Sequence, residues 1–523
     1  GWMETCGCVT AIQLSELFGI PVNRIFAGLE ALEGEGVLLR GRFANVEGEI
    51  PSNSPEIEWC HRRLLARIHR RTISGLRQEI EAVDPSVYLE FLARHQGAIP
   101  GQHKEGVDGL HDVISQLQGV DIPTGAWEQS VLPLRVNGYR PQWLDELCLS
   151  GDVGWGRLEP STKRKSPGKT FASMTRSIPV SLFLRDDYPW LVDQSRPAET
   201  PAATPHANGN GVASSDERPS LSECSREMIE LLKNKGAQFA TDLCRDLQLL
   251  PSQGNDLLGE LVAAGEITAD GFAGLRSLLN TGTSDAAPGL PSRYRRVRQR
   301  QQSLGRWTLL TPPTSTLSED EVVEEWAWQL IRRWGIVFRD LAVRESIAPP
   351  WWKLLKVYRR LEARGELRGG RFIRGVSGEQ FATSEAVREL RAVRADESPG
   401  HLLILSAADP LNLTGVIGPG LRIPGLAAHG VAYKKGQVVG WKKGEDFWIF
   451  SGLSLQEKNQ LATAWGVIGR FTNSGASRAL SEVPHSSAEA TSAELELAEE
   501  RHKRGKKRSR TPTRSGIPKP FPF

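Results

Sequence analysis

The chain has 523 residues, of which 39% are hydrophobic, and its 65 Lys and Arg against 62 Asp and Glu leave a net charge of +3. Such a length fits about three to five domains of roughly 100 to 200 residues each. The near balance of charge excludes a polyanion-binding surface spread over the whole chain. No apolar stretch approaches the roughly 20 residues of a membrane helix, so we expect no membrane partner.

The six cysteines follow no secretory signal, which is typical of a reducing cytoplasm. They lie at Cys6, Cys8, Cys60, Cys148, Cys224 and Cys244. Only the first two are close together, and no second pair stands at zinc spacing. We therefore expect a cytoplasmic protein without a metal site.

One sequence phrase occurs three times: a Leu, a Gly four residues later, and a Phe seven residues after the Gly. It is found at Leu32, Gly36 and Phe43, at Leu261, Gly265 and Phe272, and at Leu361, Gly365 and Phe372. Each phrase follows two short amphipathic runs separated by Pro, which predicts a helix, a turn, a second helix stopped by Gly, and a β-hairpin. That order is typical of a winged helix, so we expect winged helices at 1–48, 222–284 and 318–390.

The winged segment 318–390 has the clearest first helix. Ser318 and Glu321 form a capping box, and Gly335 is the expected stop. Between them the helical period places the apolar side chains on one face. These positions are 322, 323, 326, 330, 331 and 334.

The remaining segments divide by composition. Residues 49–160 are predicted to form a mainly helical domain, and 161–221 a Pro-, Ala-, Ser- and Gly-rich linker with one short ordered patch at SIPVSLFL. Residues 285–317 and 398–472 alternate β-rich runs with turns, and we expect them to complete one small β-barrel. Residues 473–523 are predicted to be a disordered basic tail. The expected fold class is α+β.

No catalytic or nucleotide-binding motif is complete. Gly168-Lys169-Thr170 ends like a phosphate-binding loop, but Lys163 stands where that loop needs its earlier Gly, and no strand precedes it. No acidic partner for Mg²⁺ follows it either. We therefore expect no catalytic residue and no bound cofactor in this chain.

Basic residues gather in 58–80, which is predicted to be helical. Arg63, Arg67 and Arg70 follow one another at i, i+4 and i+7, with Arg62 beside them and Trp59 just ahead. Arg binds phosphate bidentately, and an exposed Trp stacks on an unpaired base, so one hypothesis is a groove for single-stranded DNA. The alternative is a solvated Arg face with Trp59 as a core anchor.

The three predicted recognition helices differ in charge. The first carries Glu30, Glu33 and Glu35 and the second Asp256 and Glu260, which repel phosphate. The third is basic, as is its wing, and we expect both to contact duplex DNA. These basic residues are Lys353, Lys356, Arg360 and Arg364 on the helix and Arg368, Arg371 and Arg374 in the wing. For Trp351 and Trp352, at the helix start, core packing and exposure both remain open.

Several long phrases resemble the bacterial large helicase-related protein, a superfamily 2 DNA helicase. They include EWCHRRLLARIHRRTISGLR, AWEQSVLPLRVNGYRPQWLDELCLSGDVGWGRL, RRLEARGELRGGRFIRGVSGEQFA and SAADPLNLTGVI. By this resemblance 1–160 is the end of the helicase core, with 49–160 as its accessory domain, and 222–450 is a C-terminal extension of winged helices and a β-barrel. The resemblance implies DNA repair by ATP-driven 3′ to 5′ translocation.

The ATP-binding motifs of that family are absent from this sequence. We therefore expect the DNA-binding accessory part of the helicase, with no helicase activity of its own. Single-stranded and duplex DNA are the expected ligands, and ATP and Mg²⁺ act only with RecA-like motor domains supplied in cis or in trans. The chain begins at Gly1 and enters a winged segment at once, so we expect it to be the back part of something longer, located in the cytoplasm at the nucleoid.

Two other functions stay open. Winged helices and a β-barrel are also similar to DNA glycosylases that remove alkylated bases, and Asp409 would then position water, although Asp409-Pro410 is better explained as a turn. The acidic winged segments would alternatively serve as a scaffold for a homo-oligomer.

Overall fold

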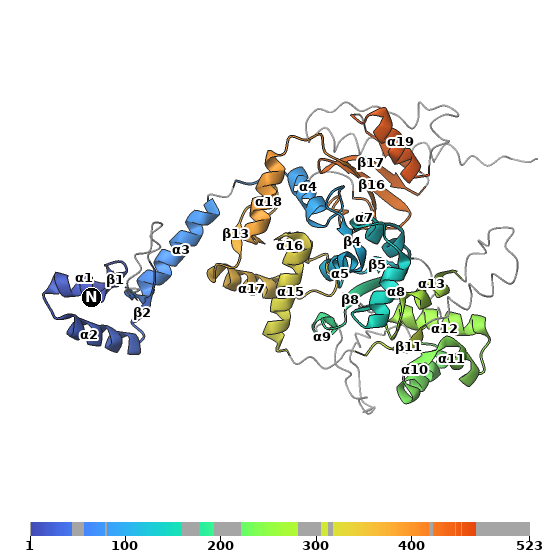
Figure 1. Cartoon of the computed structure of the whole chain (residues 1–523), viewed down its shortest axis with the longest axis horizontal. Helices are drawn as coiled ribbons and strands as arrows, with labels where there is room; N and C mark the ends of the chain where they lie inside the picture. Colours follow the sequence, from blue (N-terminus) through green and yellow to red (C-terminus); the bar gives the residue numbers. More distant parts are fainter. Residues whose placement is uncertain are drawn as a thin grey trace, which may run out of the picture. The chain divides into compact units, whose positions relative to one another are not determined.

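The computed structural model describes residues 2–43, 57–78, 81–158, 177–192, 221–280, 305–311, 317–417, 422–444, 446–450 and 452–466. Residues 1–81 with 368–371 form one compact unit, and residues 82–367 with those from 372 onward form a second (Figure 1). The possible phosphate loop at 166–170, the tail at 473–523 and all of 285–304 lie outside the described residues. Within the described ranges, no helix is both long and apolar enough to cross a bilayer.

The first winged unit contains the predicted helix pair and hairpin. Thr10 caps α1 by accepting a hydrogen bond from the backbone N–H of Gln13 (3.2 Å), and Gly19 ends the helix in the left-handed region. The strand order is β1-β3-β2. The elements are η1 (Trp2–Glu4), β1 (Val9–Thr10), α1 (Ala11–Phe18), α2 (Val22–Gly34), β2 (Leu38–Gly41) and β3 (Glu58–His61), followed by α3 (Arg62–Gln78).

A second winged unit occupies 106–184, where we predicted a mainly helical domain and a linker. The hairpin of β7 and β8 pairs with the short strand β5 in the order β5-β8-β7. The strand β8 lies in the ordered patch predicted at SIPVSLFL, and the linker prediction is wrong only for 185–192, which continue the ordered segment. The rest of 161–220 lies outside the described ranges. The elements are β4 (Lys104–Glu105), α5 (Gly106–Leu117), β5 (Ile122–Pro123), α6 (Thr124–Ala126), η2 (Trp127–Val131), α7 (Leu132–Arg135), β6 (Val136–Asn137), α8 (Pro141–Ser150), β7 (Val153–Gly156), β8 (Pro179–Leu184) and α9 (Tyr188–Val192), preceded by α4 (Pro85–His95).

The third winged unit contains a strand that we assigned to a barrel. Arg306–Leu309 (β11) pairs with both β9 and β10 and so closes the local sheet of this unit. The prediction of a barrel completed from 285–317 is therefore wrong, because the nearer partners take the strand. The elements are α10 (Glu223–Lys235), β9 (Gln238–Phe239), α11 (Ala240–Asp246), α12 (Pro251–Ala264), β10 (Ile267–Ala269), α13 (Phe272–Asn280) and β11.

The fourth winged unit matches its prediction most closely. The capping box of Ser318 and Glu321 is present, the helix stops at Gly335, and all six predicted apolar positions are buried. The sheet order is β12-β14-β13. The elements are α15 (Glu319–Trp334), β12 (Ile336–Val337), α16 (Arg339–Ala342), α17 (Trp351–Ala363), β13 (Arg368–Gly370), β14 (Gln380–Ala382) and α18 (Ser384–Ala395).

The C-terminal segment is an open sheet and not a closed barrel. Four antiparallel strands follow in the order β15-β16-β17-β18, and α19 packs its apolar side chains against one face (Figure 1). The elements are β15 (Leu402–Ser406), β16 (His429–Lys434), β17 (Gln437–Lys443), β18 (Asp446–Ile449) and α19 (Leu455–Ala464).

The described part of the chain thus contains four winged units with one strand order, in which the third strand lies between the first and the second. We predicted three because the second unit carries Leu158 where the others have Phe. Leu147, Gly151 and Leu158 keep the spacing of the repeated phrase, and Leu158 is buried like Phe272 and Phe372. The phrase therefore includes this fourth copy when any large apolar residue is allowed at its last position.

A buried ion pair joins the open sheet to the second winged unit. Both oxygens of Asp409 accept hydrogen bonds from Arg135 (2.7 and 2.8 Å), and Arg135 also donates to Gln96 (2.8 Å) and to the carbonyl of Val131 (3.0 Å). Both charged side chains are almost completely excluded from solvent. Asp409 is therefore fully engaged as a structural anchor, which contradicts a role in positioning water.

Breaking this pair should destabilise the second compact unit. Arg135→Met leaves the buried Asp409 carboxylate without its countercharge, and we expect a loss of about 3–5 kcal/mol in unfolding free energy, measured in urea. Arg388→Met removes an exposed ion pair with Glu385 and should cost no more than about 1 kcal/mol. Adding Asp409→Leu to Arg135→Met should recover much of the loss, whereas a double variant no more stable than the single one contradicts the assignment.

Candidate nucleic-acid interface

Helix α3 presents a face of arginines. It starts directly after β3, and its side chains Arg62, Arg63, Arg67, Arg70 and Arg71 are all exposed. No carboxylate of the described residues forms an ion pair with any of them. The apolar side chains of this helix are not fully covered, since Leu64 and Leu65 are half-buried and Ile68 is 39% exposed. The predicted stripe therefore exists, and its positive charge is available to an external anion.

Trp59 does not belong to this surface. Its side chain is completely buried, packs edge-to-face on Phe26 (5.9 Å between ring centroids) and joins the core of the first winged unit with Leu14 and Leu29. A ring with no exposed face cannot stack on a base. The interpretation of Trp59 as a core anchor is confirmed, and its proposed role in binding single strands is wrong.

A signal for this burial was present in the sequence. Trp59, Trp307 and Phe381 each occupy the second position of the third strand of their winged unit, and all three are buried. That strand lies in the centre of each sheet, so the position faces the helices. Comparing the repeats strand by strand would have assigned Trp59 to the core.

The basic residues of α17 are divided by their neighbours on α15. Lys353 pairs with Glu319, Arg360 with Glu324 (2.5 Å), and Arg364 with Glu324 (3.5 Å). The hydrogen bond from Lys353 lowers the pKa of Glu319, which keeps that carboxylate charged. Three of the four cations in the predicted stripe thus have a carboxylate partner on α15, although Arg360 and Arg364 share Glu324 and both remain exposed.

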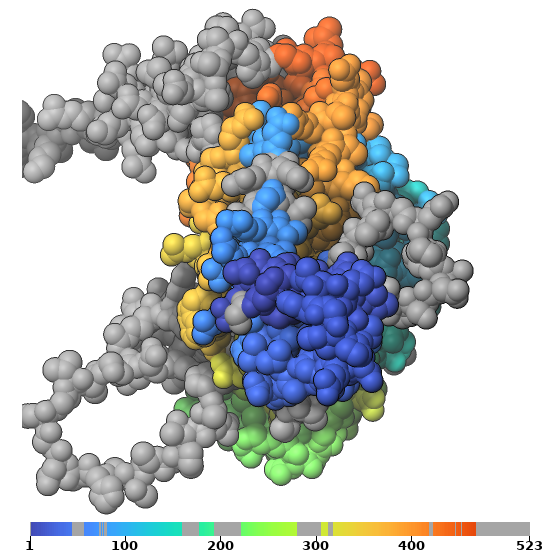
Figure 2. Space-filling model, turned by 90° about the vertical axis from the view of Figure 1, so that its left-hand side faces the viewer, coloured from blue at the N-terminus to red at the C-terminus, as the bar shows by residue number. Residues whose placement is uncertain are grey.

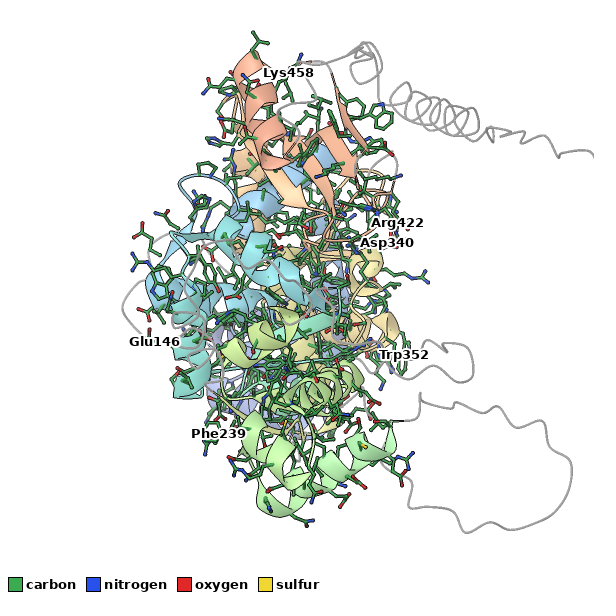
Figure 3. All side chains as sticks on the ribbon, turned by 90° about the vertical axis from the view of Figure 1, so that its right-hand side faces the viewer. Glu146, Phe239, Asp340, Trp352, Arg422 and Lys458 are labelled. Carbon is green, nitrogen blue, oxygen red and sulfur yellow. The ribbon has the colours of Figure 1, made fainter. Side chains whose placement is uncertain are left out.

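Lys356 is the exception on this helix. It pairs with no carboxylate in the described parts of the chain, and its Nζ lies 4.9 Å from the ring centroid of Trp352. Trp352 is 56% exposed, whereas Trp351 is half-buried against Tyr358 (5.8 Å). Figure 3 shows Trp352 at the surface of the gold-coloured helices. The tandem of tryptophans thus gives one packed ring and one open ring.

The remaining predicted charges differ in accessibility. Arg368 in β13 and Arg371 just after it are both exposed, as is Arg374, which pairs with Asp84 (2.8 Å).

Glu260, which we expected to make the third unit's recognition helix acidic, is buried and accepts hydrogen bonds from Ser222 and Ser225. Its charge therefore contributes to capping α10 and not to a surface.

Comparison with known proteins places these units in a family. Residues 83–170 and 316–402 each match a winged-helix domain of the large helicase-related protein. Two of the four winged units are thus similar to winged-helix domains of the large helicase-related protein. The match to 83–170 also corrects our assignment of 49–160 as a mainly helical accessory domain, in agreement with the strand order of the second winged unit.

Two curated relatives align over most of the chain. One, from Mycolicibacterium smegmatis, is named "Lhr helicase/ probable uracil glycosylase" and is 28% identical over 79% of this chain. The other, "Lhr helicase/uracil glycosylase" from Escherichia coli, is 27% identical over 80%. The alignments cover only 26% of each relative, so the chain spans about a quarter of the length of these large helicase-related proteins.

A polar cavity of about 780 Å³ lies within the second compact unit. Its walls come from α4, α5 and α18, and its acids include Asp112 and Glu389. Burial lowers the pKa of His95 there, and the ring lies 4.0 Å from Glu389. The cavity thus offers an imidazole, carboxylates, amides and the cationic side chains of Lys104 and Arg332 to a small polar group, and Lys104 pairs with Asp112 (3.2 Å).

Proposed function

We propose that this chain is the DNA-binding accessory part of a 3′ to 5′ repair helicase and acts at the nucleoid. In this proposal ATP and Mg²⁺ are used by RecA-like motor domains in cis or in trans, and not by the residues of this chain. The observation that carries it is the arginine face of α3, whose cations are exposed and have no carboxylate partner in the described ranges. Such cations bind phosphate and release counterions.

Salt dependence tests this role. Changing Arg63, Arg67 and Arg70 to Gln should weaken single-strand binding and reduce the slope of log affinity against log salt by about 2, because about 0.7 is lost per phosphate contact. The readout is fluorescence anisotropy of a labelled oligonucleotide at several salt concentrations.

A matched variant removes the same charge elsewhere. Arg40, Arg245 and Arg388 are exposed but already paired with Glu33, Asp242 and Glu385. Their change to Gln should leave the slope nearly unaltered. Equal effects of the two triple variants, or no effect of the first, would reject α3 as the phosphate-binding element.

We propose that the first winged unit receives an amphipathic helix from the motor-bearing part. Residues of η1, α1, α2 and β2 surround an open apolar surface in this unit. An apolar groove of about 330 Å³ is open there, and Figure 2 shows this unit in dark blue. Trp2 and Phe18 line the groove and are 43% and 48% exposed.

Filling the groove tests this proposal. Gly28 and Gly34 both lie in α2 with open space around an added Cβ, but only Gly28 lines the groove. Gly28→Leu should lower the fluorescence of bound anilinonaphthalene sulfonate and weaken capture of separately expressed motor domains, while Gly34→Leu should do neither. Loss of a dimer on Gly28→Leu, seen by mass in solution, would assign the groove to a second copy instead.

The names of the two relatives favour a second candidate, a uracil glycosylase activity. Because Asp409 is locked to Arg135, we propose the polar cavity with Asp112 and Glu389 as the base pocket. A flipped base needs a polar pocket of this kind, with a carboxylate to position water.

A cleavage assay tests the glycosylase proposal. The purified chain should produce alkali-labile abasic sites in a uracil-containing oligonucleotide, and Asp112→Asn or Glu389→Gln should reduce the rate by at least about tenfold, as expected for loss of a general base. Asp242→Asn, which removes a half-buried carboxylate paired with Arg245 elsewhere, should have no effect. If the unaltered chain forms no abasic sites, the activity is absent.

A further inference from the structure

We infer that Trp352 is a stacking platform for one unpaired base, with Lys356 as the contact to the neighbouring phosphate. The ligand is a single-stranded segment of nucleic acid, such as an overhang beside a duplex. This inference rests on the proposed DNA-binding function and adds a residue, a substrate feature and a binding mode to it.

The exposure of Trp352 has no explanation in the packing of the protein. The fourth unit's aromatic core is complete without it, because Tyr358 stacks on Phe381 (5.2 Å) and Trp351 covers Tyr358. Trp352 leaves more than half of its surface in water at the start of the recognition helix. An exposed indole ring presents the face on which any base can stack.

The cations around the ring identify the partner as an anion that carries an aromatic group. Lys356 and Lys353 place their Nζ atoms over the Trp352 ring, 4.9 and 5.6 Å from its centroid. One helical turn further, Arg359 is exposed and bonded to Glu379 (2.6 Å). An indole contacted by flexible lysines suits a nucleotide, because the base displaces an ammonium group from the ring and the phosphate then takes the charge.

Neutralisation of the other α17 cations decides how this site binds. Since Lys353, Arg360 and Arg364 are engaged by α15 carboxylates, Lys356 is the α17 cation left to a phosphate within the described residues. The electrostatic contribution is therefore small and stacking is the larger one. The site should discriminate a base from a missing base far more strongly than it responds to salt.

The test measures binding of a duplex with a short single-stranded overhang by anisotropy. Trp352→Ala should weaken binding between about 5-fold and 150-fold without changing the salt slope. Lys356→Gln should lower the slope by about 0.7. Phe239→Ala, which removes another exposed aromatic ring, should leave both unchanged. Trp352→Phe should restore much of the affinity.

An abasic overhang distinguishes stacking from a structural effect. The contacted base is found by placing an abasic site at each overhang position in turn. At that position the abasic site should weaken binding by the unaltered protein as much as Trp352→Ala does. It should not weaken binding by the Trp352→Ala variant any further. Independent, additive losses overturn the inference. If the unaltered protein binds no oligonucleotide, the proposed function itself fails, whereas binding that is indifferent to Trp352 removes only this site.

Discussion

The turn at the end of each recognition helix sets the geometry of every winged unit. Gly36, Gly151, Gly265 and Gly365 all have positive φ, between 71° and 95°, where a residue with a Cβ is strained. This turn reverses the chain into the second strand, and in the second, third and fourth units it brings an apolar residue, seven positions later, to the core. On α17 of the fourth unit, Trp352 and Lys356 lie on the exposed face of the helix.

Buried polar contacts then fix the units of the second compact body to one another. The second and third winged units share a continuous apolar core. In this core the ring centroid of Trp155 lies 6.0 Å from the ring centroids of both Phe272 and Trp307. The second and fourth meet through Arg333, which bonds to Glu345 and to the carbonyl of Gln118. A buried guanidinium tolerates few arrangements of its partners, so these contacts specify one relative placement in a way that apolar packing alone does not.

The parts that could be predicted are those in which local sequence decides the structure. The capping box at Ser318, the Gly stops and the apolar periods of α15 depend on neighbours in the chain. The pairing of β11 depends on competition between distant strands, and the neutralisation of Arg360 depends on which face of α15 carries Glu324. The spacing of residues along one helix or strand does not show which partner lies opposite on a distant element. Trp59 was a different case, because comparison among the repeats would have placed it correctly.

The net charge of +3 does not show that the cations of α17 and those of α3 differ in their surroundings. On α17 a phosphate must compete with carboxylates that already hold the cations, so an added anion gains little from Lys353, Arg360 or Arg364. On α3 the arginines face water, and an added anion gains the full release of condensed counterions. In the proposed function, salt therefore weakens the contribution of α3 and leaves stacking on Trp352 nearly intact, because a base on an indole ring displaces water and not ions.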